Sequence, residues 1–347
     1  MKANTADQRT GRGLRRLAVS GAALAVLVTG ACGSTQTAKP SAGGAPTSPA
    51  SASSGTQSVV GKDAYLKNAV EFNGAVDWTL SKPVRIELGE AKDSTMFFKP
   101  KNLTLTAGIP YVLELVNTGQ VKHEFTAAEF FRSSSIRKIV SDYSEVRVPF
   151  FTEIEVLAGE SVKVFAVPVI PGAFEMLCEL PGHREAGMLG TITVTGSRPA
   201  VPAPVLGSMK AGPWLQNGPD IVEAAAATWD AKAVKVRIEA GDGGGKMYFK
   251  PKQLVLKMGT PYVIELVNVG KILHEYTADE FFPTVAFRKA QDAAGEYKSP
   301  LLKEAEVLAG QQLDLYLIPT KAGTFKILCK LPGHETAGMV GTIKVTT

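Results

Sequence analysis

The strongest constraint on the fold is a long internal repeat. Residues 96–131 read MFFKPKNLTLTAGIPYVLELVNTGQVKHEFTAAEFF, and residues 247–282 read MYFKPKQLVLKMGTPYVIELVNVGKILHEYTADEFF. The segments are 151 residues apart and identical at 23 of 36 positions, and the same spacing continues to the end of the chain. A repeat of this length is a whole domain rather than one unit of a solenoid. The sequence therefore predicts two tandem domains, over residues 59–195 and 221–347, joined by a Pro- and Gly-rich linker over residues 196–220.

The first 32 residues have the features of an export signal. Four arginines precede an apolar run that is too short to anchor a helix across a bilayer. Small residues then lead to Cys32, an arrangement that resembles a bacterial lipoprotein signal and implies a lipidated Cys32. The alternatives are an ordinary cleaved signal and a twin-arginine signal. Residues 33–58 are rich in Ser, Thr, Ala, Gly and Pro and predict a flexible tether. We expect an exported protein, in the periplasm or on the cell surface, with membrane contact through the lipid anchor only.

The formal net charge of +5 comes mostly from this leader. Residues 1–31 hold five basic groups and one acidic group, a net of +4, so their removal leaves a net charge of +1. Nucleic-acid binding usually requires a strongly basic surface, so no nucleic-acid partner is expected. Hydrophobic residues make up 45% of the chain, which is typical of a globular protein and too low for an integral membrane protein.

Short stretches of alternating apolar and polar residues dominate each copy. In the first copy they include residues 84–88, 103–106 and 162–167. An alternation of period two predicts a strand with one buried face. Several such strands within roughly 110 residues predict an all-β fold, with two tandem Greek-key sandwich or barrel domains. Residues 127–143 and their counterpart, 278–297, are less regular, and we expect a long connection with a short helix there.

All four histidines and two of the three cysteines fall in one pattern that occurs twice. Each copy ends with Cys-x4-His-x4-Met, and one further histidine lies far upstream. The members are His123, Cys178, His183 and Met188 in the first copy and His274, Cys329, His334 and Met339 in the second. Thiolate and thioether sulfur favour Cu(I), whereas imidazole binds both oxidation states, so this donor set predicts a copper ion that changes oxidation state. A Pro-Gly pair inside the loop supports a tight turn that directs the histidine toward the metal.

Other interpretations explain less of this pattern. A disulfide between Cys178 and Cys329 would leave the spacing of the histidines and methionines without a reason. Zinc accepts histidine and cysteine, but a methionine ligand argues against a site built for zinc. Single histidines and methionines are usually structural, yet no histidine of this chain falls outside the pattern.

The motif Cys-x-Leu-Pro-Gly-His-x4-Met, followed by Gly-Thr-Ile and a strand, resembles the ligand loop of the cupredoxins, most closely that of rusticyanin-type and auracyanin-type proteins. The Asn-x-Gly-x3-His segments that end at His123 and His274 are similar to the upstream ligand region of that family. The resemblance covers residues 83–195 and 234–347. It implies one mononuclear type 1 (blue) copper site per copy, hence two coppers per chain cycling between Cu(I) and Cu(II), and an electron-transfer function.

The resemblance also implies that the loop histidine, His183 or His334, reaches toward the surface as the port for electrons. One position departs from the family. Cupredoxins often have Asn or Ser directly after the upstream histidine, whereas this chain has Glu124 and Glu275. A carboxylate there would either act on the metal site or face away from it.

These features predict an anchored electron carrier whose redox partner is a cytochrome or a membrane oxidoreductase. We expect that the chain is not an enzyme. Copper nitrite reductases and small laccases need further histidines for additional coppers, and all four histidines are already used, unless a partner chain supplies ligands. The alternative function is a periplasmic or cell-surface protein that stores or delivers copper.

Overall fold

The computed structural model describes residues 76–199, 215 and 217–347. The predicted signal peptide with Cys32, the predicted tether and most of the predicted linker lie outside the described residues. Within the described ranges, no helix has the length and apolar character needed to cross a membrane. The boundaries of the two domains stay predictions.

The first copy is an all-β unit with one short helix. Its elements are η1 (Trp78–Leu80), β1 (Lys82–Glu90), β2 (Met96–Lys99), β3 (Asn102–Thr106), β4 (Tyr111–Asn117), β5 (His123–Thr126), α1 (Ala128–Arg132), β6 (Ser134–Val140), β7 (Ser144–Arg147), β8 (Glu153–Val156), β9 (Ser161–Pro168), β10 (Gly172–Leu177) and β11 (Leu189–Thr195). They form one sheet in the order β2-β1-β4-β9-β6-β7 and a second in the order β8-β5-β10-β11-β3. The predicted β-sandwich fold is confirmed.

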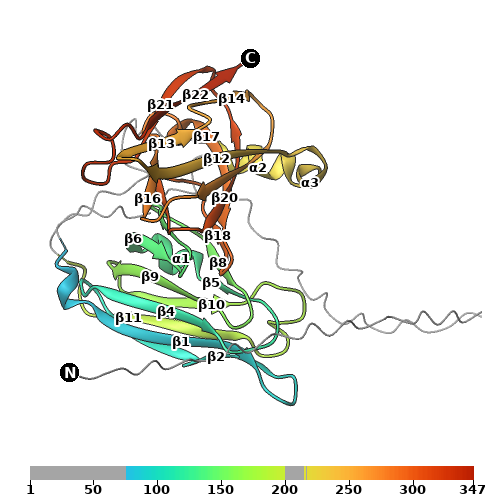
Figure 1. Ribbon diagram of the computed structural model, residues 1–347. Helices are drawn as coiled ribbons and strands as arrows, with labels where there is room; N and C mark the ends of the chain where they lie inside the picture. The colour runs from blue at the N-terminus through green and yellow to red at the C-terminus, as the bar shows by residue number, and fades with distance from the viewer. Residues whose placement is uncertain (1–75, 200–214, 216) are drawn as a thin grey trace, which may run out of the picture. The chain divides into compact units, whose positions relative to one another are not determined.

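The second copy repeats this plan behind a helical lead-in (Figure 1). Its elements are α2 (Gly218–Ala226), α3 (Trp229–Lys232), β12 (Val234–Gly243), β13 (Lys246–Lys250), β14 (Gln253–Lys257), β15 (Tyr262–Asn268), β16 (His274–Thr277), η3 (Phe282–Thr284), β17 (Val285–Gln291), β18 (Gly295–Lys298), β19 (Glu304–Val307), β20 (Gln312–Pro319), β21 (Gly323–Leu328) and β22 (Val340–Thr346). Trp229 is fully buried against Ala286 and Ile318, so the lead-in packs on β17 and β20.

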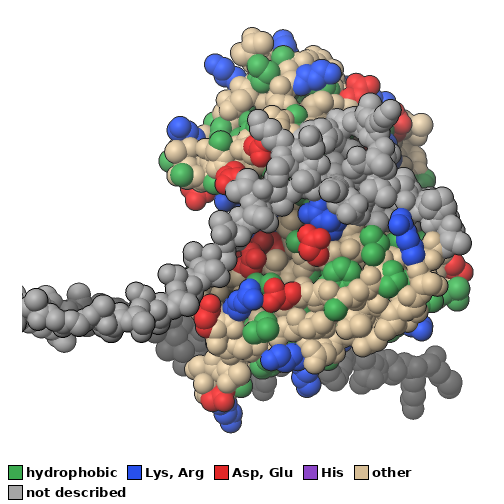
Figure 2. Space-filling view, turned by 180° about the vertical axis from the view of Figure 1, so that it is seen from behind, with side chains coloured by type: hydrophobic (Ala, Val, Ile, Leu, Met, Phe, Trp, Pro, Cys, Tyr) green, Lys and Arg blue, Asp and Glu red, His purple; other side chains and the backbone are tan. Residues whose placement is uncertain are grey.

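The alternating pattern explains the core of each sandwich. In β4, burial alternates along the strand, and Leu113 and Leu115 are completely buried between the sheets. The alternate positions, Val112, Glu114 and Val116, are half-buried. On the face of the molecule in Figure 2, Lys and Arg side chains are interspersed with Asp and Glu, and no broad patch of one sign is visible.

The two copies are not separate sandwiches, because their sheets are continuous. Strand β8 of the first copy pairs antiparallel with β18 of the second (Figure 1), and β7 of the first copy pairs with β19 of the second. Each six-stranded sheet of one copy thereby joins the five-stranded sheet of the other, which gives two sheets of 11 strands. Buried apolar residues of both copies belong to one continuous core. We call these two ladders the seam.

The seam is isologous, as in a symmetric dimer. Gly295 lies opposite Val156 in one ladder, and Ser144 lies opposite Val307 in the other. A shift of 151 residues converts each pair into the other. Strands β6 and β17 carry register shifts, at Ile136/Lys138 and at Phe287/Lys289. A bulge breaks the period-two alternation, which is why residues 127–143 and 278–297 were wrongly expected to be mainly a connection.

A buried carboxylate ties the copies together at the seam. Asp292, which is 8% exposed, accepts hydrogen bonds from Ser141 Oγ and Ser144 Oγ of the first copy, both at 2.6 Å. It also accepts bonds from Tyr297 OH at 2.9 Å and from the Ala294 N–H at 2.8 Å. Burial, and then the charge of Asp292, raise the pKa of Tyr297 well above its usual value, so this hydroxyl stays a donor.

We expect Asp292→Ala to destabilise the protein by about 2–4 kcal/mol, because the buried hydroxyls of Ser144 and Tyr297 lose their acceptor and Ser141 Oγ keeps only a long bond of 3.4 Å to the Ser144 carbonyl. Denaturant unfolding of the metal-free protein measures this change. Asp279→Ala is the matched control, since Asp279 is exposed and forms an ion pair with Lys330 at the surface. Equal stability of the two variants would contradict a central role of Asp292.

Candidate metal centre

A β-hairpin places three of the four predicted ligands of the first copy. Leu177 of β10 pairs with Leu189 of β11, so the next residues inward, Cys178 and Met188, lie side by side at the mouth of the loop. The Cys178 N–H donates to the Met188 carbonyl at 3.1 Å, and the Met188 N–H donates to the His183 carbonyl at 3.0 Å. Loop closure therefore brings the Cys, His and Met together.

The upstream histidine arrives from a different part of the chain. His123 is the first residue of β5, and buried Asn117 holds the loop that precedes it. Asn117 Nδ2 donates to the Val121 carbonyl at 2.7 Å and to the Val156 carbonyl at 2.9 Å, and its Oδ1 accepts from the Gly119 N–H at 2.9 Å. Asn268 makes the equivalent three bonds before His274.

Donor atoms converge in both copies. In the first, His183 Nδ1 lies 3.2 Å from His123 Nδ1 and 3.3 Å from Cys178 Sγ. In the second, His334 Nδ1 lies 3.2 Å from Cys329 Sγ. The donor atoms of each His-Cys-His group lie within 4.8 Å of one another. Both methionines, Met188 and Met339, are fully buried and linked to their loops by the same backbone bonds.

These groups fit a metal ion. Two nitrogens bound about 2.0 Å from one metal at a tetrahedral angle lie roughly 3.3 Å apart, close to the separation of the imidazoles in the first copy. In the second copy, neither ring nitrogen of buried His274 has a hydrogen-bond partner among the described residues. Buried polar atoms are rarely left unpaired, so an orphaned imidazole beside Cys329 and His334 points to a ligand.

The protonation states suit metal binding. Burial lowers the pKa of His183, with His123 adding to the effect, and burial lowers the pKa of His274. These imidazoles are therefore neutral near pH 7 and offer lone pairs. Burial raises the pKa of the Cys178 and Cys329 thiols, so a metal must displace a proton from each.

Both cysteines are free and buried, so the alternative of a Cys178–Cys329 disulfide is not realised. The Glu124 N–H donates to Cys178 Sγ at 3.2 Å, and the Glu275 N–H donates to Cys329 Sγ at 3.3 Å. Such bonds stabilise a thiolate. The two loop histidines differ in exposure, because His183 is half-buried whereas His334 is only 8% exposed.

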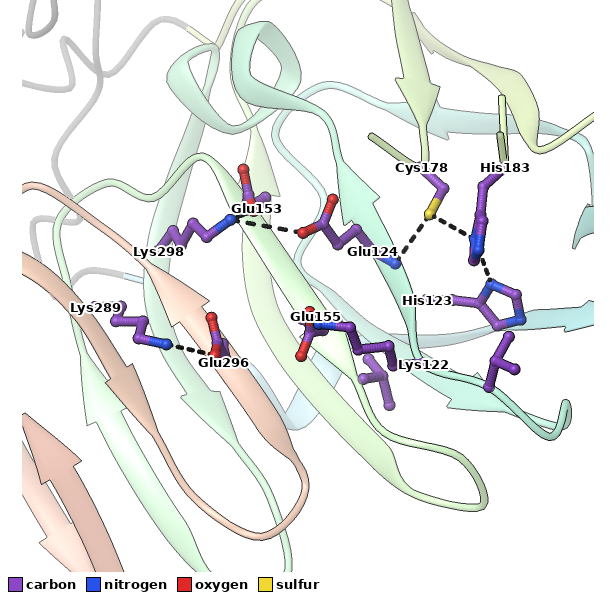
Figure 3. A network of polar contacts seen from close by, with 12 residues as sticks. Lys122, His123, Glu124, Glu153, Glu155, Cys178, His183, Lys289, Glu296 and Lys298 are labelled. Atoms are coloured by element: carbon purple, nitrogen blue, oxygen red, sulfur yellow. Dashed lines mark hydrogen bonds and ion pairs between the residues drawn. The ribbon is translucent and has the colours of Figure 1, made fainter. Parts of the chain in front are cut away.

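The carboxylates of Glu124 and Glu275 face away from the donor atoms. Successive side chains of a strand point to opposite faces, so His123 and Glu124 diverge. Glu124 instead lies 3.5 Å from Lys298 Nζ, as Figure 3 shows. Glu275 accepts a hydrogen bond from Thr277 Oγ1. Both carboxylates thus face away from the donor atoms, so neither is a ligand and any effect of their charge on a metal would act through space.

A carboxylate that was not predicted from the sequence contacts each upstream histidine. Glu90 Oε2 lies 2.9 Å from His123 Nε2, and Asp242 Oδ1 lies 3.4 Å from His274 Nε2. The second contact is too long for a good hydrogen bond, which agrees with the unpaired state of His274. A carboxylate on Nε2 holds the proton there and leaves Nδ1 free for a metal.

Strand register shows why this pair was missed. Lys82 pairs with Tyr111, whereas Val234 pairs with Tyr262, so β1 and β12 correspond at an offset of 152. Glu90 therefore matches Asp242, and a hairpin one residue shorter restores the offset of 151 afterwards. The shared Val-Arg-Ile-Glu-x-Gly segment before each carboxylate is the signal that could have revealed it.

Sequence comparisons place the chain among copper proteins. Residues 234–346 match the model of the copper binding proteins of the plastocyanin/azurin family. The chain is similar to the copper-resistant cuproprotein CopI of Rubrivivax gelatinosus, with 30% identity over 116 residues, 33% of this chain and 68% of the relative. The protein of the same name from Pseudomonas aeruginosa is 27% identical over 130 residues, 29% of this chain and 72% of the relative.

Solved structures of copper enzymes are also similar. A nitrite reductase from Thermus scotoductus is 14% identical, with 76% of this chain and 61% of that chain covered and a TM-score of 0.29. A multicopper oxidase from Campylobacter jejuni is 11% identical, with 78% and 65% covered and a TM-score of 0.31. This chain thus spans less than two thirds of each.

This finding contradicts our expectation that the chain is not an enzyme, since these structural neighbours are enzymes. That expectation is corrected. The expectation was based on the number of histidines in one chain. That number does not exclude copper sites whose ligands come from two chains. At such low identities and TM-scores, the likeness also assigns no reaction to the chain.

We expect Glu90→Ala to weaken copper binding at the first site by about 10–100-fold, because the tautomer and orientation of His123 are no longer fixed. Chelator competition in a Cys329→Ser background, which retains only the first site, measures this loss. Glu90→Gln keeps an oxygen acceptor and should fall between the wild type and the Ala variant. An unchanged affinity in Glu90→Ala would show that the contact is incidental.

Proposed function

The chain belongs to the plastocyanin/azurin family of copper-binding proteins, and from this we propose that it is an exported electron-transfer protein with two mononuclear type 1 copper sites. The observation that carries the proposal is the convergence, in both copies, of two imidazole nitrogens and a free thiol beside a buried methionine. Neither copy has lost a ligand residue, so both are proposed to function.

The residues proposed to hold copper are His123, Cys178, His183 and Met188 in the first copy and His274, Cys329, His334 and Met339 in the second. Copper supplies the one-electron Cu(II)/Cu(I) couple. The protein supplies a donor set that suits both states, and a hairpin and a braced loop that fix the donors before the metal binds. Burial of the ligands excludes water, and a rigid site changes little when its charge changes.

Storage or delivery of copper is the second candidate function. It is supported by the names of the two similar proteins, both copper-resistant cuproproteins. Buried ligands held on strands and by backbone bonds favour retention of the metal instead, which suits electron transfer better. The redox partner proposed for the first function is a cytochrome or a membrane oxidoreductase.

The family and its copper-resistant relatives support an exported protein. We further propose that Cys32 carries a lipid anchor in the periplasm or at the cell surface. Cells fed a radioactive fatty acid should label the wild-type protein but not Cys32→Ser. Labelling that is absent, or that persists in the variant, would remove the anchor from the proposal.

The copper sites are tested by loading the purified protein with Cu(II) and recording its copper content and visible spectrum. We expect two coppers per chain and an intense thiolate-to-copper charge-transfer band. Cys178→Ser and Cys329→Ser should each remove about half of the band, since each removes one of two thiolates. One copper per chain would contradict the two-site proposal. A colourless protein that yields its copper to a weak chelator would favour storage.

A further inference from the structure

A cation of the second copy lies behind the first copy's metal centre. Lys298 is on β18 and pairs across the seam with Glu153 of β8. Its Nζ forms an ion pair with Glu153 and lies 3.5 Å from Glu124 Oε1, on β5 (Figure 3). Strand β5 also begins with the predicted ligand His123, so Lys298 reaches across one strand, β8, to the ligand strand of the other copy.

This cation faces a row of carboxylates, of which two are buried and one is half-buried. Glu124 pairs with Glu155, and Glu155 pairs with Glu296 of the other copy, so three glutamates lie opposite one another on one face of the sheet. Like charges at directly opposite positions repel. Burial raises the pKa of the adjacent Glu153 to about 7, while Lys298 acts to lower it and Glu124 to raise it further. The face therefore depends on nearby cations.

The row is connected to the donor atoms through one residue. The carboxylate of Glu124 contacts Lys298, and its backbone N–H donates to Cys178 Sγ at 3.2 Å. A change in charge or position at Lys298 thus acts on Glu124, which is adjacent to His123 and is hydrogen-bonded to the Cys178 thiol.

The second copy has the mirrored arrangement. Arg147 of β7, at the position equivalent to Lys298, forms ion pairs with Glu304 and, at 3.1 Å, with Glu306. These two carboxylates and Glu275, whose N–H donates to Cys329 Sγ, lie within 4.8 Å of one another. Burial raises the pKa of Glu306 to about 7, with Glu145 adding to the rise and Arg147 opposing it.

The two centres depend on the crossing cation to different degrees. At the first, Lys122 of the same copy adds an ion pair to Glu155 at 2.7 Å. At the second, the equivalent position is Leu273, so Glu306 has Arg147 as its ion-pair partner among the described residues. Loss of Arg147 should therefore have a larger effect than loss of Lys298.

We propose that each copy supplies a positioning cation to the other copy's copper site, Lys298 to the site of Cys178 and Arg147 to the site of Cys329. This inference rests on the proposed function. A nearby positive charge stabilises the less positive, Cu(I), state, and it also holds the strand whose N–H bonds the thiolate. The two sites of one chain are thereby coupled through the seam, and neither copy would keep its redox properties in isolation.

The test measures one site at a time. Cys329→Ser retains only the first site and Cys178→Ser only the second. Lys298→Met and Arg147→Met are introduced into both backgrounds, with Lys298→Arg and Arg147→Lys as charge-conserving controls. Spectroelectrochemistry gives the reduction potential and the position of the charge-transfer band at pH 7 and pH 9. The higher pH is needed because an unpaired buried carboxylate takes up a proton and would mask the lost charge.

We expect crossed effects. Lys298→Met should lower the potential of the first site only, Arg147→Met should lower that of the second site only and by more, and the charge-conserving controls should restore both. The inference would be overturned if variants with wild-type circular dichroism show no shift in reduction potential, or an equal shift at both sites. Such a result would leave the proposed function standing. If Lys298→Met does not fold, Glu124→Gln should raise the potential of the first site, and no rise would overturn it. A parent protein without a charge-transfer band would overturn both this inference and the proposed function.

Discussion

The structure depends on the backbone pairing of two edge strands in each copy. A β-sandwich that ends in unpaired edges exposes donors and acceptors, and here each copy satisfies the edges of the other through β7–β19 and β8–β18. The ladders merge four sheets into two and make one continuous core. They also place the buried Asp292 against hydroxyls of the other copy. Duplication of the sequence has thus produced the internal equivalent of a symmetric dimer.

The same strands that close the seam adjoin the strands that carry the upstream histidines. Strand β8 pairs with β5, and β19 pairs with β16, so each predicted ligand strand lies one strand from the other copy. The hairpin loops complete the donor sets from the other side of each predicted ligand strand. Rigidity of the sites and integrity of the seam therefore have one physical origin, the hydrogen-bonded sheet that contains both.

The two copies have diverged around their proposed metal sites rather than within them. All four predicted ligand types are present twice, but neighbouring positions differ between the copies. Glu90 of the first copy corresponds to Asp242 of the second, Lys122 to Leu273, and Arg147 to Lys298. Such changes alter charge and contact distance while the donor atoms stay the same. Outer residues tune the properties of a bound metal, so the two proposed sites are expected to differ in potential.

The sequence by itself determined the duplication, the all-β class and the grouping of His, Cys and Met, because periodicity and the spacing of rare residues are local properties of the chain. It could not show that Asn117 braces a ligand loop or that Glu90 contacts His123, since these contacts join distant segments. It predicted mainly a connection over residues 127–143 and 278–297, because bulges in β6 and β17 obscure the strand pattern there. Only the tertiary structure decided that Lys298 lies behind Cys178, because strand pairing between the copies has no signature in either copy alone.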